Sequence, residues 1–442
     1  MSYQRRFTLA LADALINGPW TIDQLTRRLI DALGSVPPWR DKLLQNVYAQ
    51  FESVHSHVKR EELARFICAD SIFQIAWSRH RGELRIRSYT LAPEPSPVVR
   101  LDCDLPPIEN QKSLARWLGL SLNQLDGFAD IRGMERRVPV DRMRHYHYRW
   151  KTKNDGRHRL LEIPKSRLRN VQRQIHRGIL NRIPLHEACH GFRGGHSCLT
   201  YSAPHAGKRV VIRMDLEGFF TAITLRRIHA LFTTVGYRSS VARQLAGICC
   251  NQVPHEELAV NDGLTFDDRR RYATPHLPQG APSSPTLANL CAFRLDMRLA
   301  SLAKSLDASY TRYADDLAFS GGPRLECGVD RFHALLCHIA ADEGFSLNTR
   351  KTRVMRQGIS QRLTGIVVNN HPNYPRGDYD RLKAILYNCV RYGPESQNKS
   401  QLGDFRSHLL GRISHVRAIN PQRAGRLLDL FDRIQWNQIH YE

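Results

Sequence analysis

Two adjacent aspartates interrupt an apolar stretch, Tyr310-Thr-Arg-Tyr313-Ala-Asp315-Asp316-Leu-Ala-Phe319. The residues on either side have the composition of β-strands, so the pattern predicts a hairpin with Asp315 and Asp316 at its turn. Aspartate is common in turns, and an ordinary turn is the alternative interpretation. Two neighbouring carboxylates between apolar strands repel each other, however, unless a cation compensates their charge.

A third carboxylate ends a separate β-branched run about a hundred residues earlier, Val210-Val-Ile-Arg-Met-Asp215. Carboxylates that converge from independent strands are what a two-metal site requires. Two Mg²⁺ ions about 3.5–4 Å apart activate an attacking hydroxyl and stabilise the leaving phosphate. The three acids therefore predict phosphoryl-transfer chemistry.

A turn rich in Pro, Gly and Ser, Leu277-Pro-Gln-Gly280-Ala-Pro-Ser-Ser-Pro285, precedes the hairpin and runs into a helical stretch at residues 286–299. Taken alone, it reads as an ordinary loop and helix start. In its order and spacing with the two acidic segments, the sequence resembles the reverse transcriptases. That resemblance implies an α+β, right-hand polymerase fold with fingers, a palm with an antiparallel sheet, and a helical thumb.

More specifically, the chain is similar to the bacterial retron-type enzymes. The family's other blocks match at Gly156–Lys165, Ile183–Gly195, Gly344–Thr352 and Leu363–Asn369. Two departures from the family pattern concern RNA recognition. Leu363 stands where retrons usually carry Val, and Gln252 replaces Ala in the segment from Asn251 to His255.

The resemblance and the chemistry of the side chains together imply a metal centre. Asp215 and Asp315 would hold two Mg²⁺ ions, with the Leu216 carbonyl as a further ligand. Asp316 would be the neighbouring acid and would coordinate indirectly, because adjacent strand side chains point to opposite faces. Lys351 would protonate the departing pyrophosphate; a solvated lysine is the alternative.

The remaining site residues would bind the incoming dNTP. Arg159 and Lys153 would hold the triphosphate, since a guanidinium fork suits phosphate oxygens. Phe220 matches the family's steric gate against a ribose 2′-hydroxyl, with a core aromatic as the alternative. Gln279 and Gly280 would line the nascent base pair.

Positive charge is concentrated in one segment. Residues 141–210 contain 16 basic and 4 acidic residues, a net +12 of the chain's +23. Such a block favours a polyanionic partner, nucleic acid rather than an acidic membrane. The expected contacts with nucleic acid, some from charge and some from the resemblance, are Arg167, Arg169, Arg173, Arg177, Asn251, His255, Arg412 and Arg417.

Three domains are expected: a helical N-terminal domain at 1–135, fingers and palm at 136–371, and a thumb that binds RNA or duplex at 372–442. No apolar run reaches the roughly 18 residues of a membrane span. The ten cysteines include no C-x-x-C pair, so we do not expect a zinc site or a disulfide framework. We expect a cytoplasmic location.

Three functions compete. The first is a retron reverse transcriptase that copies a structured noncoding RNA into single-stranded DNA (msDNA), commonly in antiphage defence with an effector protein encoded nearby. The second is another bacterial reverse transcriptase, of the intron, diversity-generating or other defence-associated type. The third is a non-catalytic RNA-binding scaffold, which would have no physical need for three converging acids.

Overall fold

The computed structural model describes residues 3–16, 20–52, 58, 60–80, 84, 86, 104–131, 133–137, 144–152, 156 and 158–436. The chain divides into two compact units, Met1–Val98 and Val99–Glu442, which are described separately. Among the described helices, none has the length and apolarity that a membrane span requires.

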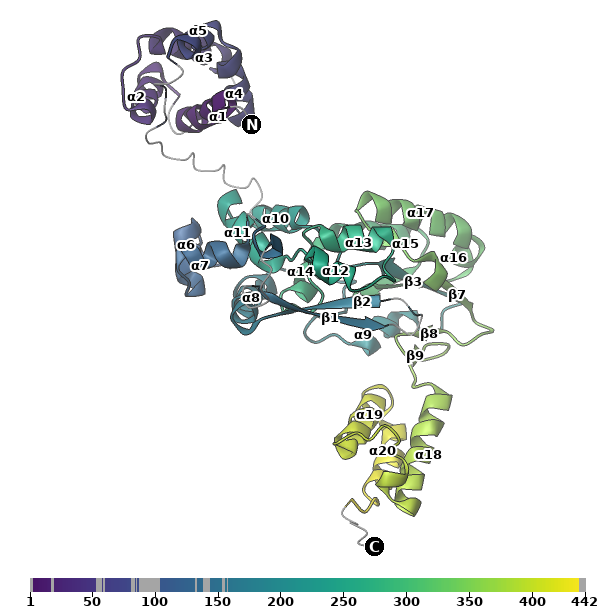
Figure 1. Cartoon of the computed structure of the whole chain (residues 1–442). Coiled ribbons are helices and arrows are strands. Elements are labelled where there is room, and N and C mark those ends of the chain that lie inside the picture. The colour runs from purple at the N-terminus through teal and green to yellow at the C-terminus, as the bar shows by residue number, and fades with distance from the viewer. Residues whose placement is uncertain are drawn as a thin grey trace. The chain divides into compact units, whose positions relative to one another are not determined.

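The first unit is helical, as the sequence predicts. Its helices are α1 (Tyr3–Ile16), α2 (Ile22–Leu33), α3 (Arg40–Phe51), α4 (Arg60–Ala69) and α5 (Ser71–His80) (Figure 1). The Thr21 side chain caps the start of α2, and Gly34 ends it with a left-handed φ of 65°. Leucines at helical spacing along α2 are buried with aromatic residues from α1 and α5 in a separate apolar core.

The boundary between the units lies earlier than the predicted residue 135. Helices α6 (Gln111–Leu118) and α7 (Leu122–Ala129) belong to the second unit. Leu114 and Leu125 are fully buried in its main apolar core. A Cβ at Gly247 of α11 (Ser239–Cys249) would lie 2.2 Å from the Ala129 carbonyl oxygen, so this glycine allows α7 to pack directly on α11. Because α6 and α7 are buried against the core of the second unit, they belong to that unit and not to the first.

A five-stranded antiparallel sheet carries the acidic segments. Its strand order is β4-β5-β3-β6, and β7 also pairs with β3. The strands are β3 (Val210–Glu217), β4 (Ser309–Tyr313), β5 (Asp316–Gly321), β6 (Ser346–Leu347) and β7 (Arg353–Arg356). In the register of β3 with β5, Asp215 lies opposite Asp316. The predicted hairpin is therefore present, and it pairs with the strand that ends at the third acid.

A second antiparallel hairpin comprises β1 (Tyr146–Thr152) and β2 (His158–Pro164), and a short one comprises β8 (Arg362–Leu363) and β9 (Ile366–Val367). After β2, α8 (Ser166–Gly178) buries its apolar face and turns Arg167, Arg173 and Arg177 to solvent, while Arg169 is half-buried.

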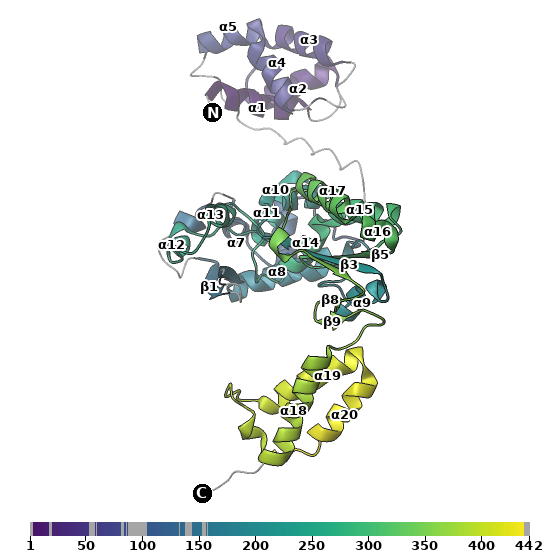
Figure 2. The same cartoon turned by 90° about the vertical axis from the view of Figure 1, so that its right-hand side faces the viewer.

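Further helices surround the main sheet (Figure 2). The expected single helix at 286–299 is two helices, because the backbone leaves helical geometry at Ala292. The α-helices that follow α8 and precede β6 are α9 (Cys198–Ser202), α10 (Leu225–Thr234), α11 (Ser239–Cys249), α12 (His255–Ala259), α13 (Phe266–Ala273), α14 (Ser284–Cys291), α15 (Phe293–Ser305), α16 (Pro323–Cys327) and α17 (Val329–Asp342).

The C-terminal part is helical, as predicted, with α18 (Arg376–Tyr392), α19 (Phe405–Ile419) and α20 (Pro421–Phe431). These helices share their own apolar core, which includes Leu386 and Leu427. Helices and antiparallel sheets together confirm the α+β class.

Candidate active site

One cavity, of about 550 Å³, contains most of the residues predicted for catalysis, metal binding and dNTP binding. It opens where β3 ends, beside the β4–β5 turn and the short 3₁₀ helix at Thr349–Lys351. The predicted residues that line it are Arg159, Asp215, Leu216, Phe220, Gln279, Asp315 and Lys351.

The β4–β5 turn places Asp315 beside Asp215. Tyr313 pairs with Asp316 across the hairpin, which leaves Ala314 and Asp315 as a two-residue loop. Ala314 has a φ of 57°, as the first loop residue of a type II′ turn requires. The Leu216 amide donates a 2.8 Å hydrogen bond to the Asp315 carbonyl. The turn is thus tied to the strand that carries the earlier acid.

A buried ion pair supports this turn from below. Arg312 and Asp296 are both fully buried, and the guanidinium donates two hydrogen bonds of 2.7 Å to the carboxylate. Arg312 also donates to the Ala314 carbonyl at 3.1 Å. An isolated buried charge is very unfavourable, so each partner depends on the other. The ion pair therefore holds the β4–β5 turn in place through the carbonyl group of Ala314.

Gly191 permits a second support for the turn. A Cβ at this position would lie 2.5 Å from the Ala314 amide nitrogen, so a side chain would displace the turn. The Gly191 carbonyl accepts a 2.8 Å hydrogen bond from the Asn289 side-chain amide. Since Arg312 also donates to the Asn289 side-chain oxygen at 2.9 Å, the two supports are connected.

Negative charge accumulates at Asp315. Burial raises the pKa of its carboxyl group, and the charges of Asp215 and Asp316 raise it further. Within the described part of the chain, the other two acids have cationic partners. Lys351 Nζ lies 3.0 Å from both carboxylate oxygens of Asp215, and Arg213 donates to Asp316 over 2.8–3.0 Å.

The donor set suits a hard divalent cation. Oxygen ligands from Asp215 and Asp315 are the type that Mg²⁺ prefers, and Asp315 has no ion-pair partner among the described residues. Those residues contain no group of three His, Cys, Asp or Glu side chains already arranged around one point. Instead, the Lys351 ammonium binds the Asp215 carboxylate, and the Arg213 guanidinium binds the Asp316 carboxylate.

Comparison with known proteins identifies the chain. A family model described as reverse transcriptase (RNA-dependent DNA polymerase) matches residues 151–379, which is more than half of the chain. The chain belongs to the reverse transcriptase family. The motif resemblance seen in the sequence is thereby confirmed.

Retron enzymes are among the relatives of this reverse transcriptase. It is 36% identical over 330 residues to the Retron Mx65 reverse transcriptase of Myxococcus xanthus, a match that covers 73% of this chain and 71% of the relative. It is 35% identical to the Retron Mx162 reverse transcriptase of the same organism (72% and 65%) and 28% identical to the Retron Ec86 reverse transcriptase of Escherichia coli (64% and 78%). The protein is an RNA-directed DNA polymerase of the retron type.

One predicted contact of this reverse transcriptase lies elsewhere than expected. Asn251 is buried, and its side chain is bonded to Glu162 and Tyr148, so it is not placed to contact RNA. Asp316, for which only indirect coordination was expected, does not line the cavity, and Arg213 binds its carboxylate. Lys153 lies outside the described residues.

The other predicted contacts lie outside the cavity. His255 is exposed at the start of α12, and Arg417 is exposed and Arg412 half-buried on α19. Gly280 follows Gln279 with a φ of 137°. The cavity also contains residues that the sequence analysis did not assign, among them Arg271, Arg350, Asp267 and Asp268. Arg350 is next to Lys351 within the family block Gly344–Thr352, and this position is the sequence signal that could have indicated a place in the cavity.

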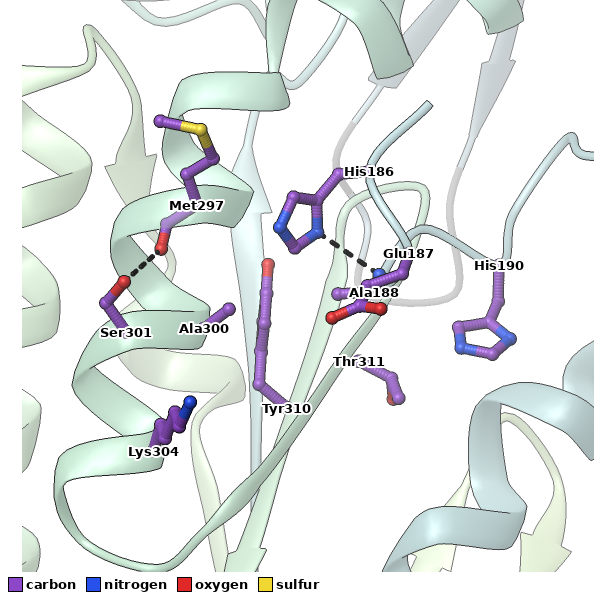
Figure 3. Close-up of a pocket in the computed structure, with 10 residues that line it drawn as sticks. All are labelled: His186, Glu187, Ala188, His190, Met297, Ala300, Ser301, Lys304, Tyr310 and Thr311. Atoms are coloured by element: carbon purple, nitrogen blue, oxygen red, sulfur yellow. Dashed lines mark hydrogen bonds between the residues drawn. The ribbon is translucent and has the colours of Figure 1, made fainter. Parts of the chain in front are cut away.

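A second cavity of about 580 Å³ lies beside β4, against α15 (Figure 3). His186, Glu187 and His190 line it, with Tyr310 between them and the helix. The segment Ile183–Gly195 therefore contributes to both cavities. Phe192 lines the first cavity, which contains Asp215 and Asp315 and is named the reaction cavity, whereas His186 and His190 line the second.

His205, buried beneath the sheet of the reverse transcriptase, predicts acid sensitivity. Its ring nitrogens lie 2.7 Å from the hydroxyls of Thr311 and Ser320, and burial lowers its pKa to about 3. Between about pH 6.5 and 3 the unfolded chain binds a proton here that the folded chain does not, so falling pH lowers stability by up to about 1.4 kcal/mol per pH unit.

We therefore expect the H205Q variant to lose less stability than the wild type as pH falls through this window. Thermal unfolding temperatures between pH 7 and pH 4 measure the difference. Equal losses in the two proteins would contradict the prediction.

Proposed function

We propose that this chain is a retron reverse transcriptase that copies a structured noncoding RNA into msDNA. The observation that carries the proposal is the convergence of Asp215 and Asp315 in one cavity with Arg159, Phe220 and Gln279. The cavity thus combines acids for a metal with a cation, an aromatic ring and an amide suited to a nucleotide.

The proposed reaction is attack of a primer 3′-hydroxyl on the α-phosphate of a dNTP. Two Mg²⁺ ions held by Asp215, Asp315 and the Leu216 carbonyl would supply charge that activates the hydroxyl and stabilises pyrophosphate. Arg159 would hold the triphosphate. Lys351 would leave Asp215 when a metal replaces it and would donate a proton to the leaving pyrophosphate.

The architecture of the proposal follows the right-hand polymerases. The β1–β2 hairpin and α8 would form the fingers, the main sheet the palm, and α18–α20 the thumb. The exposed arginines of α8 project from a helix without acidic side chains, which suits a phosphate backbone. His255, Arg412 and Arg417 would add contacts to the RNA or duplex.

The cellular setting is also part of the proposal. The nine cysteines in the described part of the chain are free thiols, which is consistent with a reducing cytoplasm. The relationship to retron enzymes extends the proposal to antiphage defence with a separate effector protein.

Expression of the gene together with its flanking DNA tests the retron proposal. We expect a branched RNA–DNA molecule in these cells and none in cells that carry the D315A/D316A variant. DNA synthesis on a primed RNA template by the purified protein, without any branched product in cells, would favour an intron-type or diversity-generating enzyme instead.

A further inference from the structure

A cluster of buried polar side chains lies next to Gln279, which lines the cavity that contains Asp215 and Asp315. Glu162 of β2 and His276 are fully buried, and Asn251 is 6% exposed. One Glu162 carboxylate oxygen lies 3.0 Å from His276 Nε2, and the other accepts a 2.7 Å hydrogen bond from Asn251 Nδ2. None of the three lines the reaction cavity, so they have no direct contact with a substrate there.

The geometry fixes the charges in this cluster. His276 Nδ1 lies 2.7 Å from the Thr274 carbonyl oxygen, and Nε2 faces the Glu162 carboxylate. Both partners are acceptors, so both ring nitrogens donate and the ring is an imidazolium. Burial alone would lower the pKa of His276, but the charge and hydrogen bond of Glu162 outweigh burial and raise it.

The cluster is joined to the turn that carries Gln279. The Glu162 amide donates to the Gln279 carbonyl at 2.9 Å, and the Gln279 amide faces the Glu162 carboxylate at 3.4 Å. A Cβ at Gly280 would lie 2.7 Å from the Glu162 carbonyl oxygen. The turn therefore rests on β2 at Glu162, through both its main chain and its side chain.

The third member connects the cluster to the end of α11. Asn251 and His276 exchange two backbone hydrogen bonds of 2.9 Å, and Asn251 Nδ2 also donates to the Tyr148 hydroxyl of β1 at 3.1 Å. Three segments that are distant in sequence thus meet at one carboxylate. Well-packed apolar residues would often stabilise a core equally well, so stability alone does not explain a buried ion pair here.

We propose that Glu162, His276 and Asn251 are positioning residues that fix Gln279 and Gly280 against the incoming nucleotide and its template base. The inference rests on the proposed function, because it assigns a role within the same reaction. A displacement of about 1 Å in such a group is enough to reduce productive binding strongly.

The E162Q variant tests the proposal. A glutamine can still accept from Asn251 and donate to a neutral His276, but its amide nitrogen would then face the Gln279 amide in place of an acceptor. We expect the KM for dNTP to rise about tenfold, with kcat within about threefold of wild type, in single-nucleotide extension of a primed RNA template. The KM for primer–template should stay constant.

Arg298→Gln is the matched control. It removes an ion pair between α15 and α17, where Arg298 contacts Asp342 and Glu343, and this pair has no contact with the turn. We expect both kinetic constants to be unchanged in R298Q. An equal rise in the KM for dNTP in R298Q would attribute the effect to general destabilisation and overturn the proposal.

A second variant, N251A, keeps the ion pair and removes one support of the Glu162 carboxylate. We expect a smaller rise in the KM for dNTP, about threefold, and this variant decides the question if E162Q does not fold. A folded variant of either kind with a wild-type KM for dNTP would refute the positioning role. Absence of nucleotide incorporation by the wild-type protein would instead refute the proposed function.

Discussion

Replacing Asp315 and Asp316 together by alanine is expected to abolish dNTP incorporation on a primed RNA template. Asp315 lines the reaction cavity beside Asp215, and its carboxylate has no ion-pair partner in the described residues. Loss of a metal ligand removes several kcal/mol of transition-state stabilisation. We therefore expect kcat to fall at least about a thousandfold, measured by primer extension.

The same variant should fold and bind RNA. The raised pKa of Asp315 reflects burial and repulsion by Asp215 and Asp316, so removing the charge relieves an unfavourable interaction. The arginines of α8 do not line the cavity. Unchanged incorporation by the folded double variant would refute the two-metal proposal.

The single variants separate the two neighbouring acids. Asp316 is bound by Arg213 and does not line the cavity, whereas Asp315 does. D315N should therefore reproduce the loss seen in the double variant, and D316N should lose less activity. Equal losses would mean that Asp316 leaves Arg213 and joins the metal centre during the reaction.

The sequence was sufficient to predict the acids and their strands. Asp315 and Asp316 follow a run whose composition indicates a strand, and the pairing of β3 with β5 brings Asp215 opposite Asp316. Local pattern and chemistry coincide here. The family resemblance adds the order of the motifs, which locates Phe220 and Gln279 in the same cavity.

Burial of polar residues could not be predicted in the same way. Arginine is a residue type usually found at the surface, yet the guanidinium of Arg312 on β4 is enclosed because Asp296 of α15 packs against it. Asn251 was expected at the RNA surface, and its partner Glu162 lies on a strand nearly ninety residues earlier. Such pairs depend on packing between distant segments, about which a single sequence carries no periodic signal.

The predicted domain boundary differs from the boundary between the two compact units for a related reason. The sequence predicts an N-terminal domain that extends to residue 135, whereas the compact units divide at Val98. Helices α6 and α7 are short and amphipathic, so their pattern shows that one face is covered but not what covers it. Their membership follows from contacts with α11.

Replacing Phe220 by alanine is expected to admit ribonucleotides. Phe219 and Phe220 both border the cavity, but Phe219 is only 3% exposed and stacks on Phe345, so it is the core aromatic of the pair. Phe220 is half-buried and lines the cavity with Asp215. Removing its ring leaves space where a ribose 2′-hydroxyl would otherwise clash.

The expected change is in selectivity rather than in rate. A single steric contact typically contributes about 10–200-fold to discrimination. We therefore expect the ratio of kcat/KM for dNTP to that for rNTP to fall by about this factor, with the rate for dNTP reduced less. Primer extension with each nucleotide class measures both constants.

Phe192→Ala is the control for this variant. Phe192 is 48% exposed, lines the same cavity and has its ring centroid 6.3 Å from that of Phe220, so both variants remove an aromatic ring from the same wall. If only the ring of Phe220 meets the sugar, F192A keeps the wild-type selectivity. Unchanged selectivity in F220A would show that another group excludes the 2′-hydroxyl, and equal losses in both variants would indicate that the pair acts as a unit.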